Sequence, residues 1–254
     1  MRLAAAGLLA VSAFAQSFEI ASIKPWSGEQ YPGTINGGPG SKNPGEIVCI
    51  GSTLQDLLLQ AYRLPLFQMD APGWITEDQW NVVARVPAGA ARADLMPMYR
   101  ELLETRFGLR THRETRELRG YAMSIGKGGR KFEESAPPLP DRSAWPKMGM
   151  SKDGFITFPP GYENMMTQPP DAEGIRRLSA GRATMARLAG YLGRFLKAPV
   201  EDRTGLSGFF DFHLAYTEQT LVTDVERLGL KMTPARLTAD VLVIDALQRK
   251  PIEN

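Results

Sequence analysis

The stretch EDRTGLSGFFDF, residues 201–212, combines acidic, basic, hydroxyl, glycine and phenylalanine residues in a short span. Asp202 could bind or activate a ligand, but it can equally accept backbone N–H bonds in an Asx-turn, and Arg203 is free to pair with a carboxylate. The glycines permit turn geometry that residues with a Cβ resist. We favour a turn that starts a strand over a catalytic loop. The candidate binding residues here are Asp202, Arg203, Thr204, Gly205, Gly208 and Asp211.

Few other residues could carry catalysis. The chain contains two histidines, His112 and His213, and lacks H-E-x-x-H, cysteine-pair and G-x-S-x-G motifs. A zinc site needs three or four ligands, so two strand histidines with Glu114 or Asp211 form a weak constellation, and surface positions are favoured. The glycine-rich run INGGPG (35–40) precedes no helix and is not a phosphate loop. The sequence therefore predicts no catalytic residue, no metal site and no cofactor.

Carboxylate pairs and one thiol complete the reactive groups. Two acids flanking a bond could hydrolyse a glycoside. Glu133 with Glu134 is one such pair and Asp202 with Asp211 is another, but nothing in the sequence places either around a cleft. Cys49 is the single cysteine, so no internal disulfide forms. It lies in the apolar run EIVCIG, and we expect a buried, inert thiol.

Two predicted helices share one apolar spacing. After Thr53, apolar residues occupy one helical face, and Asp56 provides a capping signal. After Thr184 the same spacing recurs. The first face is Leu54, Leu57, Leu58, Ala61 and Tyr62, and the second is Met185, Leu188, Ala189 and Leu192.

Each helix leads to a strand in which apolar residues alternate with others. The alternating residues are Trp80, Val82, Ala84 and Val86 in the first strand, and Phe210, Phe212, Leu214 and Tyr216 in the second. Helical patterns at 95–112 and 221–232 follow, and they contain the similar runs RFGLR and RLGLK. The glycine of each run is expected to stop the helix by adopting φ > 0.

These correspondences predict an internal duplication in which each half has a strand, a helix, strands, a helix and a hairpin. The fold class is α+β, with helices packed on mainly antiparallel sheets. Eight of the 19 prolines lie in 127–180, where they oppose a central strand or helix interior. The expected hairpins join 110–114 to 121–125 and 231–236 to 241–247. The expected domains are a signal peptide (1–15), a first repeat (16–126), a proline-rich linker (127–180) and a second repeat (181–254).

The N-terminal residues MRLAAAGLLAVSAFAQS have the layout of a secretory signal. Arg2 is an early cation, residues 3–11 form an uncharged apolar run, and small residues follow, with cleavage expected after Ala15. The run is too short to span a bilayer, and no other stretch approaches membrane length. We expect a secreted or periplasmic protein with no membrane span in the mature chain.

Charge provides no sign of a nucleic-acid partner. The 254 residues carry a formal net charge of +2, and basic residues alternate with acidic ones, as in HRETRE (112–117). Such a distribution produces no strong field toward nucleic acid. We expect the partner to be a protein or an envelope or extracellular ligand.

The stretch VEDRTGLSGFFDFHLAY, together with FEIASIKP, TLQDLLLQAY, APGWI, RFGLRTHRETREL and VLVIDAL, resembles the soil-associated protein family expanded in acidobacteria. The likeness covers residues 18–251, and 202–212 is its most specific motif. It implies an uncharacterised extracytoplasmic domain, since members are secreted and some resemble the outer part of membrane-anchored sensor-peptidases. The family brings no activity to carry over. Cys49 departs from the family pattern, which has a polar or small residue there.

Residues 53–70 are also similar to the short N-terminal domain of secretins and TonB-dependent receptors, which mediates protein contacts in the periplasm. A Thr-Leu helix start with a following strand carries this likeness, and many α+β folds share that pattern.

Aromatic and methionine side chains in loops are the remaining candidates for a binding surface, including Trp74 and Trp145. Their alternative role is to pack the loops onto the domains. We favour a secreted binding or protein-interaction module of unknown ligand, without catalysis. The alternatives are an extracytoplasmic hydrolase acting on envelope or extracellular polymer, and a sensor ectodomain.

Overall fold

The computed structural model describes residues 17–138 and 148–252, which fall into two compact units. Unit 1 is Met1–Glu114 with Val241–Asn254, and unit 2 is Thr115–Asp240. Both units combine helices with mainly antiparallel strands, so the α+β fold class is confirmed. In the described part of the chain, no helix has the length and apolar character needed to cross a membrane.

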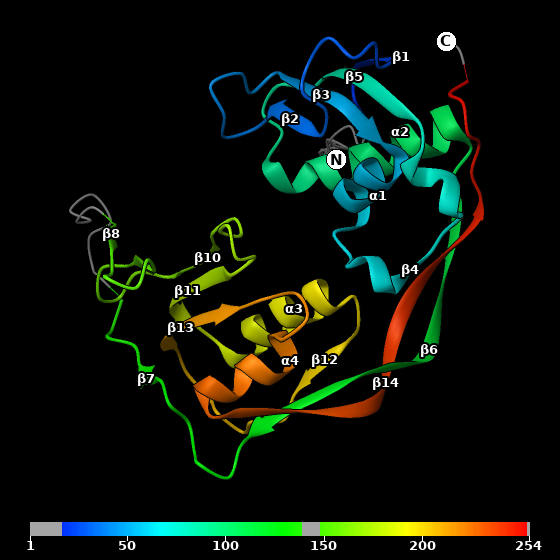
Figure 1. Ribbon diagram of the computed structural model, residues 1–254. Helices are drawn as coiled ribbons and strands as arrows, with labels where there is room; N and C mark the ends of the chain where they lie inside the picture. Colours follow the sequence, from blue (N-terminus) through cyan, green and yellow to red (C-terminus); the bar gives the residue numbers. More distant parts are fainter. Residues whose placement is uncertain (1–16, 139–147, 253–254) are drawn as a thin grey trace, which may run out of the picture. The chain divides into compact units, whose positions relative to one another are not determined.

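Unit 1 is built on an antiparallel sheet with the strand order β1-β5-β3-β2. Its helices α1 and α2 lie side by side against one face of this sheet (Figure 1). The elements are β1 (Ile20–Pro25), β2 (Thr34–Gly37), β3 (Glu46–Thr53), α1 (Leu54–Tyr62), η1 (Leu66–Gln68), β4 (Met69–Asp70), η2 (Gly73–Thr76), β5 (Gln79–Arg85), η3 (Arg92–Asp94) and α2 (Leu95–Phe107).

The predicted capping signal and apolar face of α1 are confirmed. The Thr53 hydroxyl accepts the Asp56 N–H at 3.2 Å, and the Asp56 carboxylate accepts the Thr53 N–H at 2.9 Å, which completes a capping box. The apolar face then packs on the inward side chains of β3 and β5. Each leucine buried in this way contributes about 1.5–3 kcal/mol to stability. The buried α1 residues are Leu54, Leu57, Leu58 and Ala61.

Unit 2 contains a second antiparallel sheet with the order β10-β11-β13-β7, and α3, α4 and η5 pack on it. A small ladder joins β8 to β9. The elements are β7 (Glu133–Glu134), β8 (Gly149–Met150), β9 (Ile156–Thr157), β10 (Asn164–Thr167), β11 (Arg176–Ala183), α3 (Met185–Leu196), β12 (Val200–Asp202), β13 (Phe210–Tyr216), α4 (Leu221–Asp224) and η5 (Val225–Leu228).

A β-bulge precedes the N-capped helix of each unit. In unit 1, Gly51 has φ 55° and its N–H donates to Asn81 Oδ1 at 3.0 Å. In unit 2, Arg182 has φ 46° and its N–H donates to Asp211 Oδ1 at 2.8 Å. The bulge and the neighbouring acceptor therefore recur, which supports the duplication; the duplication itself stays a prediction.

The two predicted hairpins are wrong. Residues 110–125 form one strand, β6 (Arg110–Ile125), and residues 230–246 form another, β14 (Leu230–Ala246). These strands are neighbours in a third sheet of order β12-β6-β14-β4, in which β12 pairs with β6 in parallel and β4 pairs with β14 in parallel. The segment TRELRG (115–120) contains no turn-forming dipeptide, and its alternating burial continues through β6, so nothing ends the strand.

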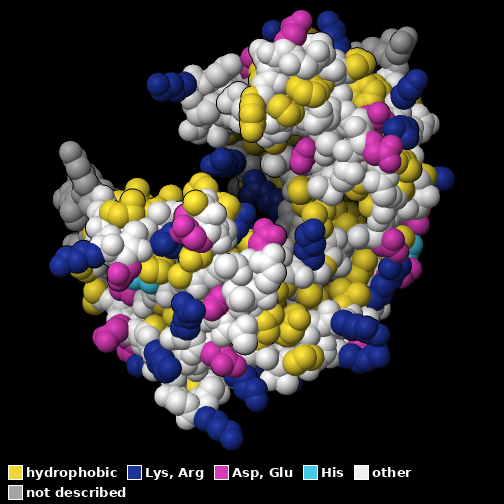
Figure 2. Space-filling view, viewed as in Figure 1, with side chains coloured by type: hydrophobic (Ala, Val, Ile, Leu, Met, Phe, Trp, Pro, Cys, Tyr) yellow, Lys and Arg dark blue, Asp and Glu magenta, His cyan; other side chains and the backbone are white. Residues whose placement is uncertain are grey.

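Charged side chains are mixed over the surface. Figure 2 shows basic and acidic groups interspersed on the visible face, as the alternating charges of the sequence predict. Ion pairs between exposed side chains of this kind contribute about 0–1 kcal/mol each.

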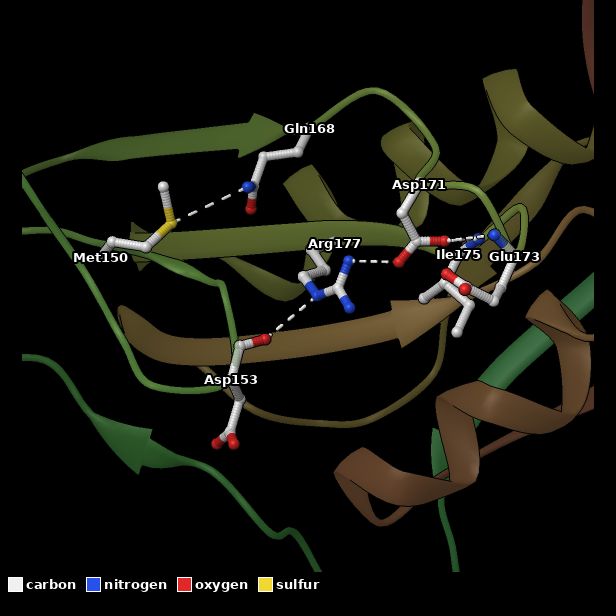
Figure 3. A network of polar contacts seen from close by, with 7 residues as sticks. All are labelled: Met150, Asp153, Gln168, Asp171, Glu173, Ile175 and Arg177. Carbon is white, nitrogen blue, oxygen red and sulfur yellow. Dashed lines mark hydrogen bonds and ion pairs between the residues drawn. The ribbon is translucent and has the colours of Figure 1, made fainter.

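The range 127–180, predicted as a linker, holds β7 to β10 and the start of β11. Arg177 on β11 anchors it, because its Nη1 lies 2.7 Å from Asp171 Oδ2 and its Nε donates to the Asp153 carbonyl at 3.1 Å (Figure 3). Arg177 also holds the pKa of Asp171 below its usual range. The chain passes from one compact unit to the other after Glu114 and again after Asp240. The division into two repeats and a linker stays a prediction.

Candidate binding site

The turn at 202–208 has the Asx geometry that its sequence suggests. Asp202 Oδ1 accepts the N–H of Thr204 at 2.9 Å and its hydroxyl at 2.7 Å. Gly205 and Gly208 have φ 69° and 108°, which favour glycine. Arg203 pairs with exposed Glu201 at 2.6 Å. These contacts shape the backbone that leads into β13.

The predicted alternation of β13 is confirmed, since every second residue from Phe210 to Tyr216 is buried. Asp211 and His213 lie on the opposite face. His213 is exposed and stacks on Phe155 with ring centroids 4.9 Å apart. The turn and the strand together place Phe209 and Asp211 next to the bulge of β11.

Four residues meet at this bulge, and we call them the bulge cluster: Ser135, Arg182, Phe209 and Asp211. Asp211 Oδ1 accepts both the Ser135 hydroxyl and the Arg182 N–H. The Ser135 N–H donates to the Phe209 carbonyl at 2.9 Å. The candidate residue Asp211 is therefore joined by three residues that the sequence analysis missed.

Arg182 is the unusual member of the bulge cluster. It is only 9% exposed. Its Nη1 donates to the Ala136 carbonyl at 2.8 Å, and its Cζ lies 4.1 Å from the centroid of the Phe209 ring. Its Nε is buried without a hydrogen-bond partner. A signal was present in the sequence, because Arg182 stands where the matched strand of the first half has Gly51.

Unit 2 also contains a cavity of about 560 Å³, which we call the arginine-rimmed cavity. Strand β6 and strand β14 form two of its walls, and the turn after α3 forms the third. Gly120 lets the turn come close, because a Cβ there would overlap the Pro199 carbonyl. The lining residues are Arg119, Gly120, Tyr121, Leu196, Ala198, Pro234, Ala235 and Arg236.

Of the two candidate tryptophans, the structure describes only Trp74. Trp74, on η2, is half-buried and packs against the core of unit 1. Trp145 lies outside the described residues. A further cavity of unit 1, of about 570 Å³, is lined instead by Trp26 and Trp80, beside Arg249, which pairs with Glu77 at 2.8 Å.

The groups that could do acid–base work are scattered. Cys49 is fully buried, as predicted, and burial raises the pKa of its thiol. Burial also raises the pKa of Glu101, which lines a cavity of about 270 Å³ in unit 1. Within residues 17–138 and 148–252, no three His, Cys, Asp or Glu side chains are placed to hold a metal ion.

His112 lies between two carboxylates on the surface of unit 1. Its Nε2 is 2.9 Å from Glu114 Oε1 and its Nδ1 is 2.8 Å from Asp245 Oδ1. The imidazolium can donate to both, so Glu114 and Asp245 raise the pKa of His112. This links β6 to β14 with a charge that depends on pH.

We expect the contribution of His112 to stability to grow as the pH falls. A raised folded-state pKa means that the stabilisation is complete below the unfolded-state pKa of about 6.5 and is lost as the pH rises through the folded-state pKa. The free energy of unfolding of wild type and of His112→Gln should differ more at about pH 5.5 than at about pH 8.5. An equal difference at both pH values would contradict the assignment.

Comparison with known proteins identifies one relationship. Residues 55–247 match the protein family described as "Protein of unknown function (DUF3738)". Neither the curated proteins nor the solved structures contain a match to the chain. The matched range includes the turn, the bulge cluster and the arginine-rimmed cavity.

Proposed function

The chain belongs to the DUF3738 family of unknown function, and we propose that it is a secreted or periplasmic binding module that takes an organic anion without catalysing a reaction. The signal-like residues 1–15 support the location, and so does the resemblance to a soil-associated, acidobacterial family of secreted proteins. The recurring bulges at Gly51 and Arg182 support an origin of the two halves by duplication.

The arginine-rimmed cavity is the observation that carries the binding proposal. Its volume of about 560 Å³ lies within the range of about 300–1,000 Å³ typical of small-molecule sites. Apolar side chains such as Leu196 and Pro234 offer burial to the body of a ligand, and Arg119 and Arg236 offer positive charge. In the described part of the chain Arg119 has no ion pair, and Arg236 has an exposed one with Glu117 at 2.8 Å.

The same lining supports binding over catalysis. The lining side chains include no carboxyl, imidazole or thiol group, and these are the usual general acids, bases and nucleophiles. Glu101, a carboxyl with a raised pKa, belongs to a different cavity in unit 1. One perturbed carboxyl falls short of the convergent groups that mark a hydrolase site.

Arg119→Gln tests the proposal directly. We expect wild type to bind decanoate saturably in isothermal titration calorimetry, because the acid presents a carboxylate on an apolar chain. The variant should bind about threefold to tenfold more weakly, as expected for the loss of one solvent-exposed charge contact. Arg119 is exposed, so folding should be unaffected.

Arg113→Gln is the matched control. Arg113 is an exposed arginine on the same strand β6, and it does not line the cavity. The Arg113→Gln variant loses the same charge as Arg119→Gln but outside the cavity, so its affinity for decanoate should equal that of wild type. Absence of saturable binding by wild type, or an equal loss in both variants, would refute the cavity as the binding site.

A further inference from the structure

We propose that the bulge cluster of unit 2 is a separate anion site, in which the Nε and Nη2 edge of Arg182 binds a carboxylate group side-on. The proposal goes beyond the arginine-rimmed cavity, because it concerns other residues and can be tested independently of that cavity. Four observations lead to it: a strained backbone, a buried cation, an occupied acceptor and an electropositive helix start.

The backbone of Arg182 is strained in a position where glycine would fit. Arg182 has φ 46° inside a strand bulge, and the matched bulge of unit 1 has Gly51 at φ 55°. Two other described non-glycine residues with positive φ, Arg63 and Lys197, are helix C-caps, where the left-handed conformation is common. Strain that persists in a strand is typical of a functional position.

The guanidinium of Arg182 is buried without a matching anion. Burying a cation is costly unless it is paired and hydrogen-bonded. The Ala136 carbonyl satisfies Nη1 and the Phe209 ring covers one face, but Nε has no acceptor. Among the residues that the structure describes, no Asp or Glu lies within ion-pair distance of this guanidinium. The group is therefore short of an acceptor and of a negative charge.

The shape of the unsatisfied edge favours a carboxylate. The N–H of Nε and one N–H of Nη2 point in the same direction and match two oxygens of a planar anion. Nη1 is already engaged by Ala136, so this edge is the one left for a ligand. The ring of Phe209, which is 37% exposed, has its centroid 4.1 Å from Cζ and covers one face of the guanidinium, so Phe209 leaves the Nε and Nη2 edge without an acceptor.

Asp211 does not serve as the missing partner. Its Oδ1 accepts the Arg182 N–H at 2.8 Å together with the Ser135 hydroxyl, and these bonds hold the bulge. In unit 1 the equivalent acceptor is the neutral amide of Asn81. The backbone bond therefore needs an oxygen rather than a charge, and the guanidinium stays available.

The start of α3 adds positive potential. Helix α3 begins three residues after Arg182, and its first turn contains no acidic residue. Position N3 is Arg187, whereas the matched position of α1 is Asp56. The partial positive charge of a helix N-terminus favours anions when no acid neutralises it. Two arginines of unit 2 thus stand where unit 1 has a glycine and an acid; Arg187 has an ion pair with Glu163 at 4.0 Å, so the helix N-terminus itself provides the positive potential.

The test is a titration observed at the arginine side chains of the full ¹⁵N-labelled protein by NMR. Sodium acetate is the probe, sodium chloride at equal ionic strength is the control, and sodium phosphate distinguishes a phosphate site. We expect the Nε–Hε resonance of Arg182, correlated to its own backbone, to shift saturably with acetate and to stay in place with chloride. A resonance that does not move, or that moves equally with chloride, overturns the site. A saturable response to phosphate alone overturns its assignment to carboxylates.

Two variants separate this site from structural effects and from the cavity. Wild type should melt at a higher temperature in acetate than in chloride of equal ionic strength. Arg182→Gly has the residue that stands at the matched position of unit 1, so it should fold but show no such rise. Asp211→Asn keeps an oxygen for the bulge N–H and removes a nearby negative charge, so acetate should bind at least as tightly as to wild type. The Arg182 response should persist in Arg119→Gln; its loss there would place the acetate in the cavity and refute the bulge site.

Discussion

Gly229→Ala is expected to lower the free energy of unfolding by at least about 3 kcal/mol. Gly229 ends η5 with φ 73°, so any side chain there is strained. An added Cβ would overlap the Gly129 carbonyl oxygen and lie 2.9 Å from its carbon. Neither backbone can move away easily, because the Gly126 N–H donates to the Gly229 carbonyl at 2.8 Å and the Lys131 N–H to the Leu228 carbonyl at 2.9 Å.

Gly190→Ala is the control for this substitution. Gly190 is exposed within α3, and an added Cβ meets no heavy atom within 4 Å. Alanine should therefore stabilise the helix by about 0.5–1 kcal/mol. Urea denaturation followed by circular dichroism measures both variants, and a Gly229→Ala protein within about 1 kcal/mol of wild type would contradict the close approach.

Gly229 also shows what a local sequence pattern can predict and what it cannot. The run RLGLK predicts that its glycine ends a helix with φ > 0, and the structure confirms this. The contact with Gly129 could not be predicted from the sequence, because Gly129 lies in the range 127–180, whose prolines suggested a linker. Proline excludes residues from the interior of a sheet or helix, but it does not prevent edge strands such as β7 and β10.

The existence of a strand could be predicted where apolar and polar residues alternate, but its length was harder to predict. The alternation from Phe210 to Tyr216 predicts β13, because one face of this antiparallel strand packs on the core. The middle of β6 is mostly polar and has no run of alternating apolar residues, so the sequence alone suggested two short strands joined in a hairpin. The length of β6 depends on its position beside the distant strand β14 in the third sheet, which no local pattern records.

The candidate site was only partly predictable for a similar reason. Asp211 was identified from its motif, and the turn around Asp202 behaves as its residue types suggest. Arg182 is inconspicuous in the run SAGRAT, where it precedes a helix cap. The burial and backbone strain of Arg182 come from the bulge. Only its positional match with Gly51 could have identified it as a candidate site residue. The arginine-rimmed cavity is lined by the separate segments 119–121, 196–198 and 234–236, so no local pattern in the sequence indicated it.

Replacement by alanine should destabilise the protein strongly at Phe210 and only slightly at the adjacent Phe209. Phe210 is 1% exposed and meets the Phe132 ring edge-to-face with centroids 5.3 Å apart. Phe210→Ala should lower the free energy of unfolding by about 3–5 kcal/mol, as buried phenylalanines usually do. Phe209 directly precedes the strand, is 37% exposed, and has its ring over the guanidinium of Arg182.

Phe209→Ala should cost less than about 1 kcal/mol of stability, because its ring is partly exposed and outside the core. It should nevertheless change the acetate response of Arg182, since it uncovers the guanidinium and admits water to compete for the carboxylate. Denaturation of both variants and the arginine titration of Phe209→Ala measure these effects. Equal losses of stability would mean that both rings support the core, and an unaltered acetate response would separate Phe209 from the anion site.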